Sequence, residues 1–279
     1  MPEGPEIRRA ADQIENVLID RPVLDISFAF EHLQGYEEIL QGAYIKKVET
    51  KGKAMLIRFE NGYTIYSHNQ LYGKWYTRNA YNYPKTNRQL RLAIHNEKKS
   101  ALLYSASDIE VLRDEEVPDH PFIRKVGPDL LNEDVSVEDL VERFKSRKFH
   151  RRKWTSLLLD QAFIAGIGNY LRSEILFVAG IHPDLRPVDC SDRQLEKAAE
   201  ASIELIWRSY RHKGITNDID LAEQLKKQGA KRYEYRHWVF NREAKPCRID
   251  GTEIIKINAG SRRCYYCPTC QKKPESRTS

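Results

Sequence analysis

The chain lacks any long hydrophobic run. Apolar stretches such as 157–159 and 175–179 are far shorter than the ~20 residues that cross a bilayer as a helix. No apolar segment follows the first basic residues, as a secretory signal peptide would require. These absences argue against a membrane-spanning helix and a secretory signal. We interpret the chain as cytoplasmic, or as nucleoid-associated if its source is bacterial.

Cysteine is scarce over most of the 279 residues. Cys190 stands alone, and the other four cysteines lie within the last 33 positions. In a cytosolic chain, this clustering indicates metal binding before disulfide formation.

The spacing of the terminal cysteines is that of a two-knuckle zinc ribbon, with one exception. Cys247 and Asp250 form the first pair, Cys267 and Cys270 form the second, and sixteen residues separate the pairs. Asp250 occupies a cysteine position, and carboxylate oxygen is an allowed but less usual zinc ligand. Residues 251–267 predict a strand, a glycine turn and a second strand. Three interpretations stay open: Asp250 completes the site, Cys264 supplies the fourth ligand, or no metal binds and packing alone holds this β-hairpin.

Net acidic charge is confined to the first half of the chain. The net charge of +6 divides into about −5 for residues 1–140 and about +11 for residues 141–279. The densest basic run, residues 145–153, is interleaved with and followed by aromatic side chains, Phe149 and Trp154. This pattern favours an anionic partner, nucleic acid first, over a merely solvated surface.

The first 112 residues predict one helix followed by strands. Apolar residues at i, i+4, i+7 and i+11 form one helical face: Ile7, Ala11, Ile14 and Leu18. This helix should end near residues 20–22. Residues 23–112 then alternate short β-rich runs with turn signals and show no helical periodicity, which predicts a β-sandwich or barrel.

A proline-rich, charged stretch at 114–128 marks a boundary, and helical patterns follow it. The predicted helices are 135–145, 153–165, 169–179 and 192–210. The segment 212–237 has little periodicity and is predicted to be a loop. The predicted organisation is therefore a domain with the first helix and the β-sandwich at 1–125, a helical domain at 126–237, a zinc-ribbon-type module at 238–271 and a frayed tail at 272–279.

Two glycines separate the second and third of these helices. Asn169 follows Gly168 and sits where the N-cap of the third helix is expected. A helix N-terminus of this kind binds phosphate well, although an ordinary helical hairpin with an Asn cap has the same pattern.

Several motifs resemble, in order and spacing, those of the formamidopyrimidine-DNA glycosylase/endonuclease VIII family. They are MPEGPEIRR at the start, KGKA (51–54), YSHNQLYG (66–73), VGPD (126–129), QAFIAGIGNYLRSEIL (161–176) and KPC…CPTC near the end. The likeness extends to about residue 271. MPEGPE and YSHNQLYG are more similar to the endonuclease VIII branch than to the branch that excises oxidised guanine.

The resemblance implies a fold and a reaction. The fold would be α+β, with an N-terminal helix and β-sandwich, then a helical domain with a helix–two-turn–helix motif and a zinc-ribbon β-hairpin. The protein would be a DNA glycosylase (a hydrolase) and an AP lyase. It would act as a monomer on double-stranded DNA that contains oxidised pyrimidines or abasic sites, and cleave the strand by β,δ-elimination. Zn²⁺ would be structural, and the chemistry would use no cofactor.

The resemblance also implies catalytic roles. With Met1 removed, Pro2 would be a terminal amine, and α-amino groups have a pKa of about 7.7–8.0 in general, so a usable fraction is neutral. Such an amine can attack C1′ of the sugar and form a covalent iminium. Glu3 would move protons at the sugar. Lys53 and Arg262 would bind the phosphates and assist elimination.

Further residues are implied in DNA binding and support. Residues that fill the gap left by an everted nucleotide would offset part of the unstacking cost: Gln70, Leu71 and Tyr72. Lys125 and Asn169 would contact the DNA backbone. Glu6 and Glu174 would support the site.

Two other functions stay open at this point. One is excision of oxidised guanine or formamidopyrimidine by the same chemistry. The other is a non-catalytic protein that binds damaged DNA on the same scaffold. The joint presence of Pro2, Glu3, Lys53 and Arg262 argues against the second.

Overall fold

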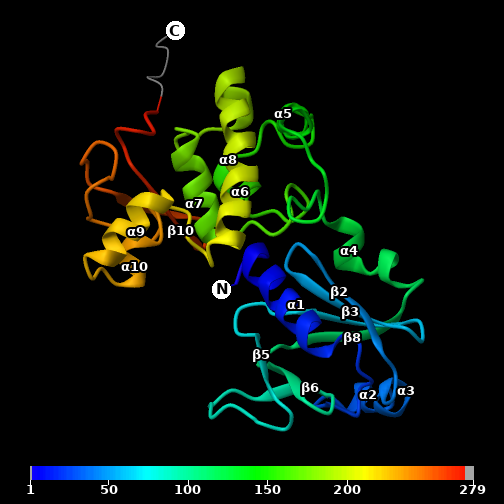
Figure 1. Ribbon diagram of the computed structural model, residues 1–279. Coiled ribbons are helices and arrows are strands. Elements are labelled where there is room, and N and C mark those ends of the chain that lie inside the picture. The colour runs from blue at the N-terminus through cyan, green and yellow to red at the C-terminus, as the bar shows by residue number, and fades with distance from the viewer. Residues whose placement is uncertain (1, 274–279) are drawn as a thin grey trace. The chain divides into compact units, whose positions relative to one another are not determined.

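The computed structural model describes residues 2–273, and the chain divides into two compact units between Val126 and Gly127 (Figure 1). Met1 and residues 274–279, which include most of the predicted tail, lie outside the described part. Within the described part, no helix combines the length and the apolar composition that a bilayer crossing needs.

The first unit begins with α1 (Gly4–Leu18), and its predicted apolar face is confirmed. The four predicted side chains are each 2% exposed or less. Asp20 leaves the helix with φ 63°, and Pro22 follows, so the helix ends where the sequence predicts. The backbone N–H of Val48 donates to Glu15 Oε1 at 3.0 Å, which ties α1 to the sheet beneath it.

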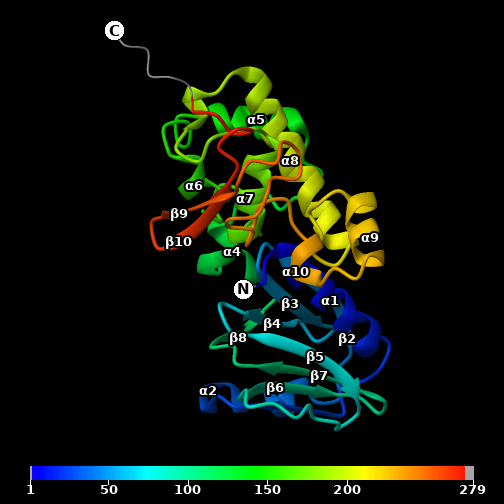
Figure 2. The same ribbon diagram turned by 90° about the vertical axis from the view of Figure 1, so that its left-hand side faces the viewer.

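Two antiparallel four-stranded sheets follow, as the β-rich pattern predicts. Their strand orders are β2–β3–β4–β8 and β1–β6–β7–β5 (Figure 2). The strands are β1 (Asp25–Phe28), β2 (Ile45–Lys51), β3 (Ala54–Phe59), β4 (Tyr63–His68), β5 (Lys74–Asn79), β6 (Leu90–His95), β7 (Lys99–Tyr104) and β8 (Asp108–Arg113). Side chains from both sheets and from α1 share one hydrophobic core, which makes the unit a sandwich covered by a helix.

Some short elements of this unit were not predicted. The single-turn helices α2 (Glu31–Gln34) and α3 (Glu37–Leu40) are too short for a periodic signal. η1 (Val117–Asp119) and α4 (Pro121–Lys125) end the unit within the proline-rich stretch.

The second unit is mainly helical. Its elements are α5 (Val137–Lys145), α6 (Trp154–Leu157), α7 (Asn169–Val178), η2 (Pro187–Asp189), α8 (Asp192–Arg211), α9 (Ile219–Lys227), α10 (Arg232–Tyr235) and the hairpin of β9 (Ile255–Ala259) and β10 (Arg262–Tyr266). α7 is buried along most of its length at the centre of the core that α5 and α8 complete. The predicted strand–turn–strand is confirmed, because Arg262 pairs directly with Ala259.

Two secondary-structure elements of this unit were predicted wrongly. The helix predicted at 153–165 ends at Leu157, because the next segment bonds to another part of the chain. Gly127 N donates to Gln161 O, and Ala165 N donates to Pro128 O, each at 2.9 Å. A Cβ on Gly127 would lie 2.6 Å from the carbonyl oxygen of Ala162, so this close approach requires glycine.

The segment predicted as a loop at 212–237 contains α9 and α10. Asp218 caps α9 by accepting a hydrogen bond from Leu221 N at 2.9 Å. Ala222 is the residue that α9 buries, so this helix carries almost no hydrophobic periodicity to detect.

Candidate active site and metal cluster

The first turn of α1 fixes the backbone at the start of the chain. Glu3 precedes the helix and is 2% exposed. Its backbone N–H donates to Glu6 Oε2 at 3.1 Å, and Glu6 also pairs with Arg9 at 3.1 Å. Glu6 therefore closes the helix end that carries Glu3, and Pro2 directly precedes this capped turn.

Lys53 lies in a two-residue turn between β2 and β3. Lys51 pairs with Ala54, so Gly52 and Lys53 form the turn, and Gly52 has φ 60°. Glycine at the first position of a two-residue hairpin turn accommodates this conformation at no steric cost. Lys53 is only 9% exposed, which is unusual for lysine.

The end of β4 lies beside this turn. Ala54 pairs with His68, the last residue of β4. Burial lowers the pKa of His68, Asp108 opposes this shift, and the Lys53 cation adds to it. The Lys53 cation therefore acts electrostatically on His68, the last residue of β4. The 69–73 turn begins directly after His68.

The 69–73 turn follows β4 directly and holds two apolar side chains outward. Leu71 is 50% exposed and Tyr72 is 67% exposed. Gly73 N donates to Asn69 O at 2.7 Å, and a Cβ on Gly73 would come within 2.6 Å of the Asn69 backbone. Gln70 has φ 46° and accepts a hydrogen bond from Ser107 Oγ at 3.1 Å. The turn is closed, and glycine is required to close it.

Lys125 is the exposed last residue of α4. His120 caps this short helix by accepting a hydrogen bond from Phe122 N at 3.3 Å. The His120 ring packs on Tyr66 with the ring centroids 4.1 Å apart. The helix that carries Lys125 is therefore anchored on β4.

In the second unit, the backbone before α7 is held by side chains. Gln161 accepts from Gly166 N at 3.1 Å and donates to Ile167 O at 2.9 Å. Arg143 of α5 donates to two carbonyls of the same turns, Ala162 O and Phe163 O, both at 2.6 Å. These contacts set the position at which α7 begins.

The N-cap of α7 is Gly168, and Asn169 is the first helical residue. The predicted N-cap is therefore wrong by one position. Gly168 has φ −135° and ψ −150°. The Asn169 side chain is on the first turn of a helix whose opening N–H groups lack intrahelical partners.

Arg172, a residue that our sequence reasoning missed, links Asn169 to the hairpin. It is 0% exposed and donates to Asn169 Oδ1 at 2.9 Å, to Arg263 O at 2.7 Å and to Thr155 O at 3.0 Å. Because the amide oxygen of Asn169 accepts from Arg172, its NH₂ group is the donor that it can offer to a phosphate. The signal in the sequence was an arginine one helical turn after Asn169.

The hairpin turn holds Arg262 as the first residue of β10. Gly260 has φ 65° and lies in the two-residue turn that precedes it. Arg262 is half-buried, whereas Arg263 is exposed. A cavity of about 400 Å³ adjoins the turn, and its lining is Arg152, Lys153, Thr155, Ser156, Asp184 and residues 257–260.

Glu174 has a supporting position and is fully buried. Its Oε1 accepts from the backbone N–H groups of Val239 and Phe240, both at 2.9 Å. Its Oε2 accepts from Trp238 N at 2.8 Å and from Thr216 Oγ1 at 2.5 Å. This carboxylate joins α7 to the segment that leads into the cysteine-rich module.

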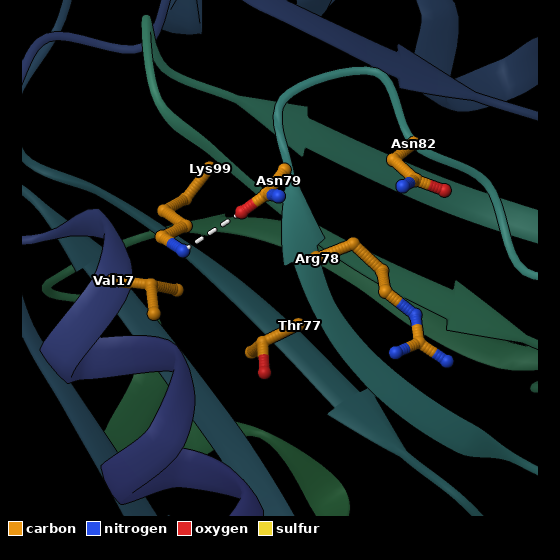
Figure 3. A pocket seen from close by; sticks show the side chains of 6 residues that line it. All are labelled: Val17, Thr77, Arg78, Asn79, Asn82 and Lys99. Atoms are coloured by element: carbon orange, nitrogen blue, oxygen red, sulfur yellow. Dashed lines mark hydrogen bonds between the residues drawn. The ribbon is translucent and has the colours of Figure 1, made fainter.

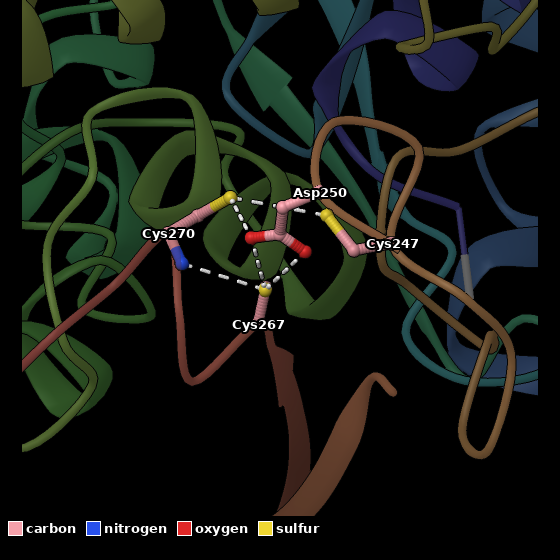
Figure 4. Close-up of side chains that lie close together, drawn as sticks. All are labelled: Cys247, Asp250, Cys267 and Cys270. Atoms are coloured by element: carbon pink, nitrogen blue, oxygen red, sulfur yellow. Dashed lines mark hydrogen bonds between the residues drawn. The ribbon is translucent and has the colours of Figure 1, made fainter. Parts of the chain in front are cut away.

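Four side chains of that module converge on one point (Figure 4). The ligand atoms of Cys247, Asp250, Cys267 and Cys270 all lie within 4.8 Å of one another. Sγ of Cys247 and Sγ of Cys270 are 3.8 Å apart. Asp250 Oδ2 is 3.0 Å from Cys270 Sγ and 3.4 Å from Cys267 Sγ. Zinc–sulfur bonds of ~2.3 Å give a tetrahedral edge of about 3.8 Å, so the donor set fits zinc.

Cys264, the alternative fourth ligand, is not a member of this cluster. Its side chain is 0% exposed in the helical core, and its Sγ lies 3.7 Å from Ser173 Oγ.

A separate polar cavity of about 260 Å³ lies in the first unit (Figure 3). Its lining is Val17, Thr77, Arg78, Asn79, Asn82 and Lys99. Lys99 donates to Asn79 Oδ1 at 3.0 Å, and Arg78 extends away from Lys99. The two cations do not converge, so this cavity is not built to hold one anion.

Comparison with known proteins connects both units to one family. The formamidopyrimidine-DNA glycosylase N-terminal domain matches residues 1–106, and the formamidopyrimidine-DNA glycosylase H2TH domain matches residues 126–220. Endonuclease 8 of Escherichia coli and of Shigella sonnei are each 44% identical over 271 residues, which is 97% of this chain and 100% of each relative. Endonuclease 8 of Salmonella agona is 43% identical over 272 residues, 98% of this chain and 100% of that protein.

Solved structures establish the fold. The formamidopyrimidine-DNA glycosylase of Lactococcus lactis, non-covalently bound to DNA with an AP site, has a TM-score of 0.80 at 20% identity and covers 97% of this chain and 100% of its own. The same enzyme with oxidised-pyrimidine DNA has a TM-score of 0.80 at 21% identity, with 98% and 100% covered. The predicted α+β fold is confirmed.

Proposed function

The chain belongs to the formamidopyrimidine-DNA glycosylase/endonuclease VIII family, and on this premise we propose that it removes oxidised pyrimidines from double-stranded DNA. Enzymes of this family are DNA glycosylases with AP lyase activity, so the chain acts in base-excision repair. The observation that favours pyrimidines is the 43–44% identity to endonuclease 8 proteins over nearly the whole chain. Because the substrate is DNA, we expect the protein to work in the cytoplasm or on the nucleoid.

Pro2 is the proposed nucleophile. With Met1 removed, its secondary amine adds to C1′, the damaged base leaves with its bonding electrons and a proton, and the C1′–O4′ bond opens. A secondary amine gives an iminium that keeps its positive charge. This cation acidifies C2′, so the C2′ proton and the 3′ phosphate leave by β-elimination. The conjugated iminium that results acidifies C4′, and loss of the C4′ proton expels the 5′ phosphate by δ-elimination.

Glu3 is the proposed proton carrier for O4′ during ring opening. Its burial and its place beside Pro2 support this role. Glu6 supports it indirectly, because Glu6 caps the turn that carries Glu3.

Lys53 and Arg262 are the proposed phosphate ligands, and each lies in or beside a two-residue hairpin turn with a left-handed glycine. A cation on a rigid turn loses little entropy when it meets a phosphate.

Five more residues are proposed to hold the DNA. Gln70, Leu71 and Tyr72 would fill the gap left by the everted nucleotide, which their exposure on a closed turn supports. Asn169, with its amide oxygen held by Arg172, would donate to a phosphate at the start of α7. Lys125 would add a backbone contact from α4.

Cys247, Asp250, Cys267 and Cys270 are the proposed zinc ligands. Zinc bound there would be a structural link between the two knuckles that flank the hairpin. The role of this chain's residues is then to keep the β9–β10 turn, and with it Arg262, in place.

A borohydride trap tests the mechanism. Reduction in the presence of DNA with thymine glycol should yield a covalent protein–DNA complex joined through Pro2. Pro2→Gly combined with Glu3→Gln should abolish the complex. A trapped complex of undiminished yield in that variant would refute the assigned nucleophile, and a failure of the unmodified chain to cleave would favour a non-catalytic DNA-binding role.

A lesion panel tests the substrate class. Excision rates should be higher for thymine glycol and hydroxylated cytosine than for oxidised guanine in otherwise identical duplexes. The reverse ranking would indicate that the chain belongs to the branch of the family that excises oxidised guanine.

A further inference from the structure

A loop outside the proposed DNA contacts reaches the 69–73 turn. We propose that Arg88, on the loop of residues 80–89 between β5 and β6, is a positioning residue that braces the 69–73 turn for insertion into duplex DNA. This inference rests on the proposed role of Leu71 and Tyr72. We call residues 80–89 the brace loop.

The brace is a hydrogen bond to the backbone. Arg88 Nη1 donates to the carbonyl oxygen of Tyr72, and the Arg88 backbone N–H donates to Thr86 Oγ1 at 3.3 Å. The bond to Tyr72 joins two segments sixteen residues apart. A guanidinium can hold a carbonyl from a fixed direction, because its donors form a planar fork.

The brace loop is itself anchored at both ends, so it can hold the 69–73 turn in place. At its start, Tyr81 stacks on the His95 ring with the centroids 4.3 Å apart, and Tyr83 OH lies 3.0 Å from His95 Nε2. Tyr81 N also donates to Ser100 Oγ at 2.9 Å. At its end, Ser105 N donates to Gln89 O at 2.8 Å, next to Arg88. His95 is 1% exposed, so these anchors lie on the body of the sheet.

The 69–73 turn has a conformation that needs such support. Gln70 is in the left-handed region with φ 46°, which side chains other than glycine adopt rarely. Ser107 contacts the turn through Gln70, and Arg88 contacts it through Tyr72. Fixing the turn before binding reduces the ordering entropy that insertion of Leu71 and Tyr72 would otherwise cost.

The proposal separates duplex from single-stranded substrates. Eversion from a duplex leaves a gap opposite an intact base, and the turn has that gap to fill. A lesion in a single strand leaves no such gap. Loss of the brace should therefore weaken excision from duplex DNA and leave excision from single-stranded DNA almost unchanged.

The experiment compares Arg88→Ala with Arg88→Lys and with a matched control, Lys85→Ala. Lys85 is an exposed cation of the same loop, so its removal measures the effect of charge alone. For thymine glycol in a duplex, Arg88→Ala should lower kcat/KM about tenfold, the scale of one lost charge-assisted hydrogen bond. The same lesion in a single strand should change by less than about twofold. Arg88→Lys should recover part of the loss, and Lys85→Ala should leave both rates unchanged.

A second readout does not depend on catalysis. A duplex with 2-aminopurine opposite a stable abasic analogue reports insertion of the turn as a change in fluorescence, which Arg88→Ala should reduce. If the unmodified chain excised nothing, the proposed function would fail and this readout would still test the brace. Equal losses on duplex and single-stranded DNA with a reduced salt dependence would show a direct phosphate contact and overturn the proposal. Full additivity of Arg88→Ala with Leu71→Ala would also overturn it, because residues that act through one element couple.

Discussion

The second unit contains a fully buried arginine, Arg172 of α7, that joins three segments of the chain. Arg172 is 0% exposed, and three acceptors from three segments surround its guanidinium: Thr155 O, Asn169 Oδ1 and Arg263 O. Burial of a charge is tolerated only where hydrogen bonds compensate for lost hydration. Arg172 therefore contributes both to the stability of the second unit and to the position of Asn169, a proposed phosphate ligand.

Substitution of this residue should affect folding and DNA binding together. Arg172→Met should destabilise the second unit by about 2–4 kcal/mol, since three acceptors lose a buried partner. Urea unfolding followed by circular dichroism measures this change. Arg193→Ala, on the exposed face of α8, is the control and should stay within about 0.5 kcal/mol of the unmodified chain. An unchanged midpoint for Arg172→Met would contradict the assigned role.

Only some of the site residues could be predicted from the sequence. Pro2, Glu3, Lys53 and Asn169 could be proposed because they lie in short local motifs. Arg172 acts through a carbonyl 91 residues away, and Arg88 acts through another backbone carbonyl. Such contacts leave no pattern in the spacing of residue types.

At the scale of elements, periodicity decided which predictions succeeded. α1 and α8 each bury a regular apolar face and were predicted close to their bounds. α9 is polar, so it was not predicted. α6 is shorter than predicted, because the segment after it is held by other bonds: Gly127 N donates to Gln161 O, and Pro128 O accepts from Ala165 N. Tertiary hydrogen bonds and capping overrode local propensity in both places.

The segment that follows α10 should respond to acid. His237 Nδ1–H donates to Thr216 Oγ1 at 2.8 Å, because the Thr216 hydroxyl itself donates to Glu174, and His237 is 4% exposed. Burial first, and then the cations of Arg236, Arg232 and Arg248, lower the pKa of His237 well below its ordinary 6.5. The unfolded chain therefore binds a proton below pH 6.5 that the folded chain does not. Its contribution to stability is complete above that pH and is lost as the pH falls, by about 1 kcal/mol per pH unit.

Unfolding midpoints between pH 7.5 and 5 check this expectation. The second unit should lose stability on acidification, and His237→Gln should flatten the curve. His212→Gln, at an exposed position, should leave the slope as it is. A steeper slope in His237→Gln would show that the histidine is protonated in the folded state.

The cysteine-rich module gives a prediction about metal. Elemental analysis of protein purified without chelators should find about one zinc per chain, as one tetrahedral site requires. Asp250→Ala should lower this occupancy, Asp250→Cys should retain it, and Cys190→Ser, outside the cluster, should not change it. Chelation should weaken DNA binding through Arg262 while the first unit keeps its melting behaviour. No zinc in unchelated protein would leave the hairpin to be held by packing alone.

At the scale of the whole molecule, charge is divided unevenly along the chain. The second half carries the positive excess, and it contains Asn169 and Arg262, whereas Glu3 and Lys53 belong to the first unit. Long-range attraction to DNA should therefore come mainly from the second unit.

DNA affinity should fall steeply with salt, because each phosphate contact releases counterions. In a plot of log affinity against log salt concentration, Arg262→Ala should reduce the slope by about one contact. Arg193→Ala should leave the slope unchanged. A flat salt dependence of the unmodified chain would contradict the assigned phosphate contacts.

The link from Arg172 to the hairpin passes through the carbonyl oxygen of residue 263 and not through its side chain. Every amino acid supplies the same carbonyl, so position 263 is free to vary in identity while the docking of the hairpin persists. Substitutions at position 263 should therefore leave the neighbouring Arg262 in the same position. A change of the exposed Arg263 side chain should therefore leave the contact between α7 and the hairpin intact.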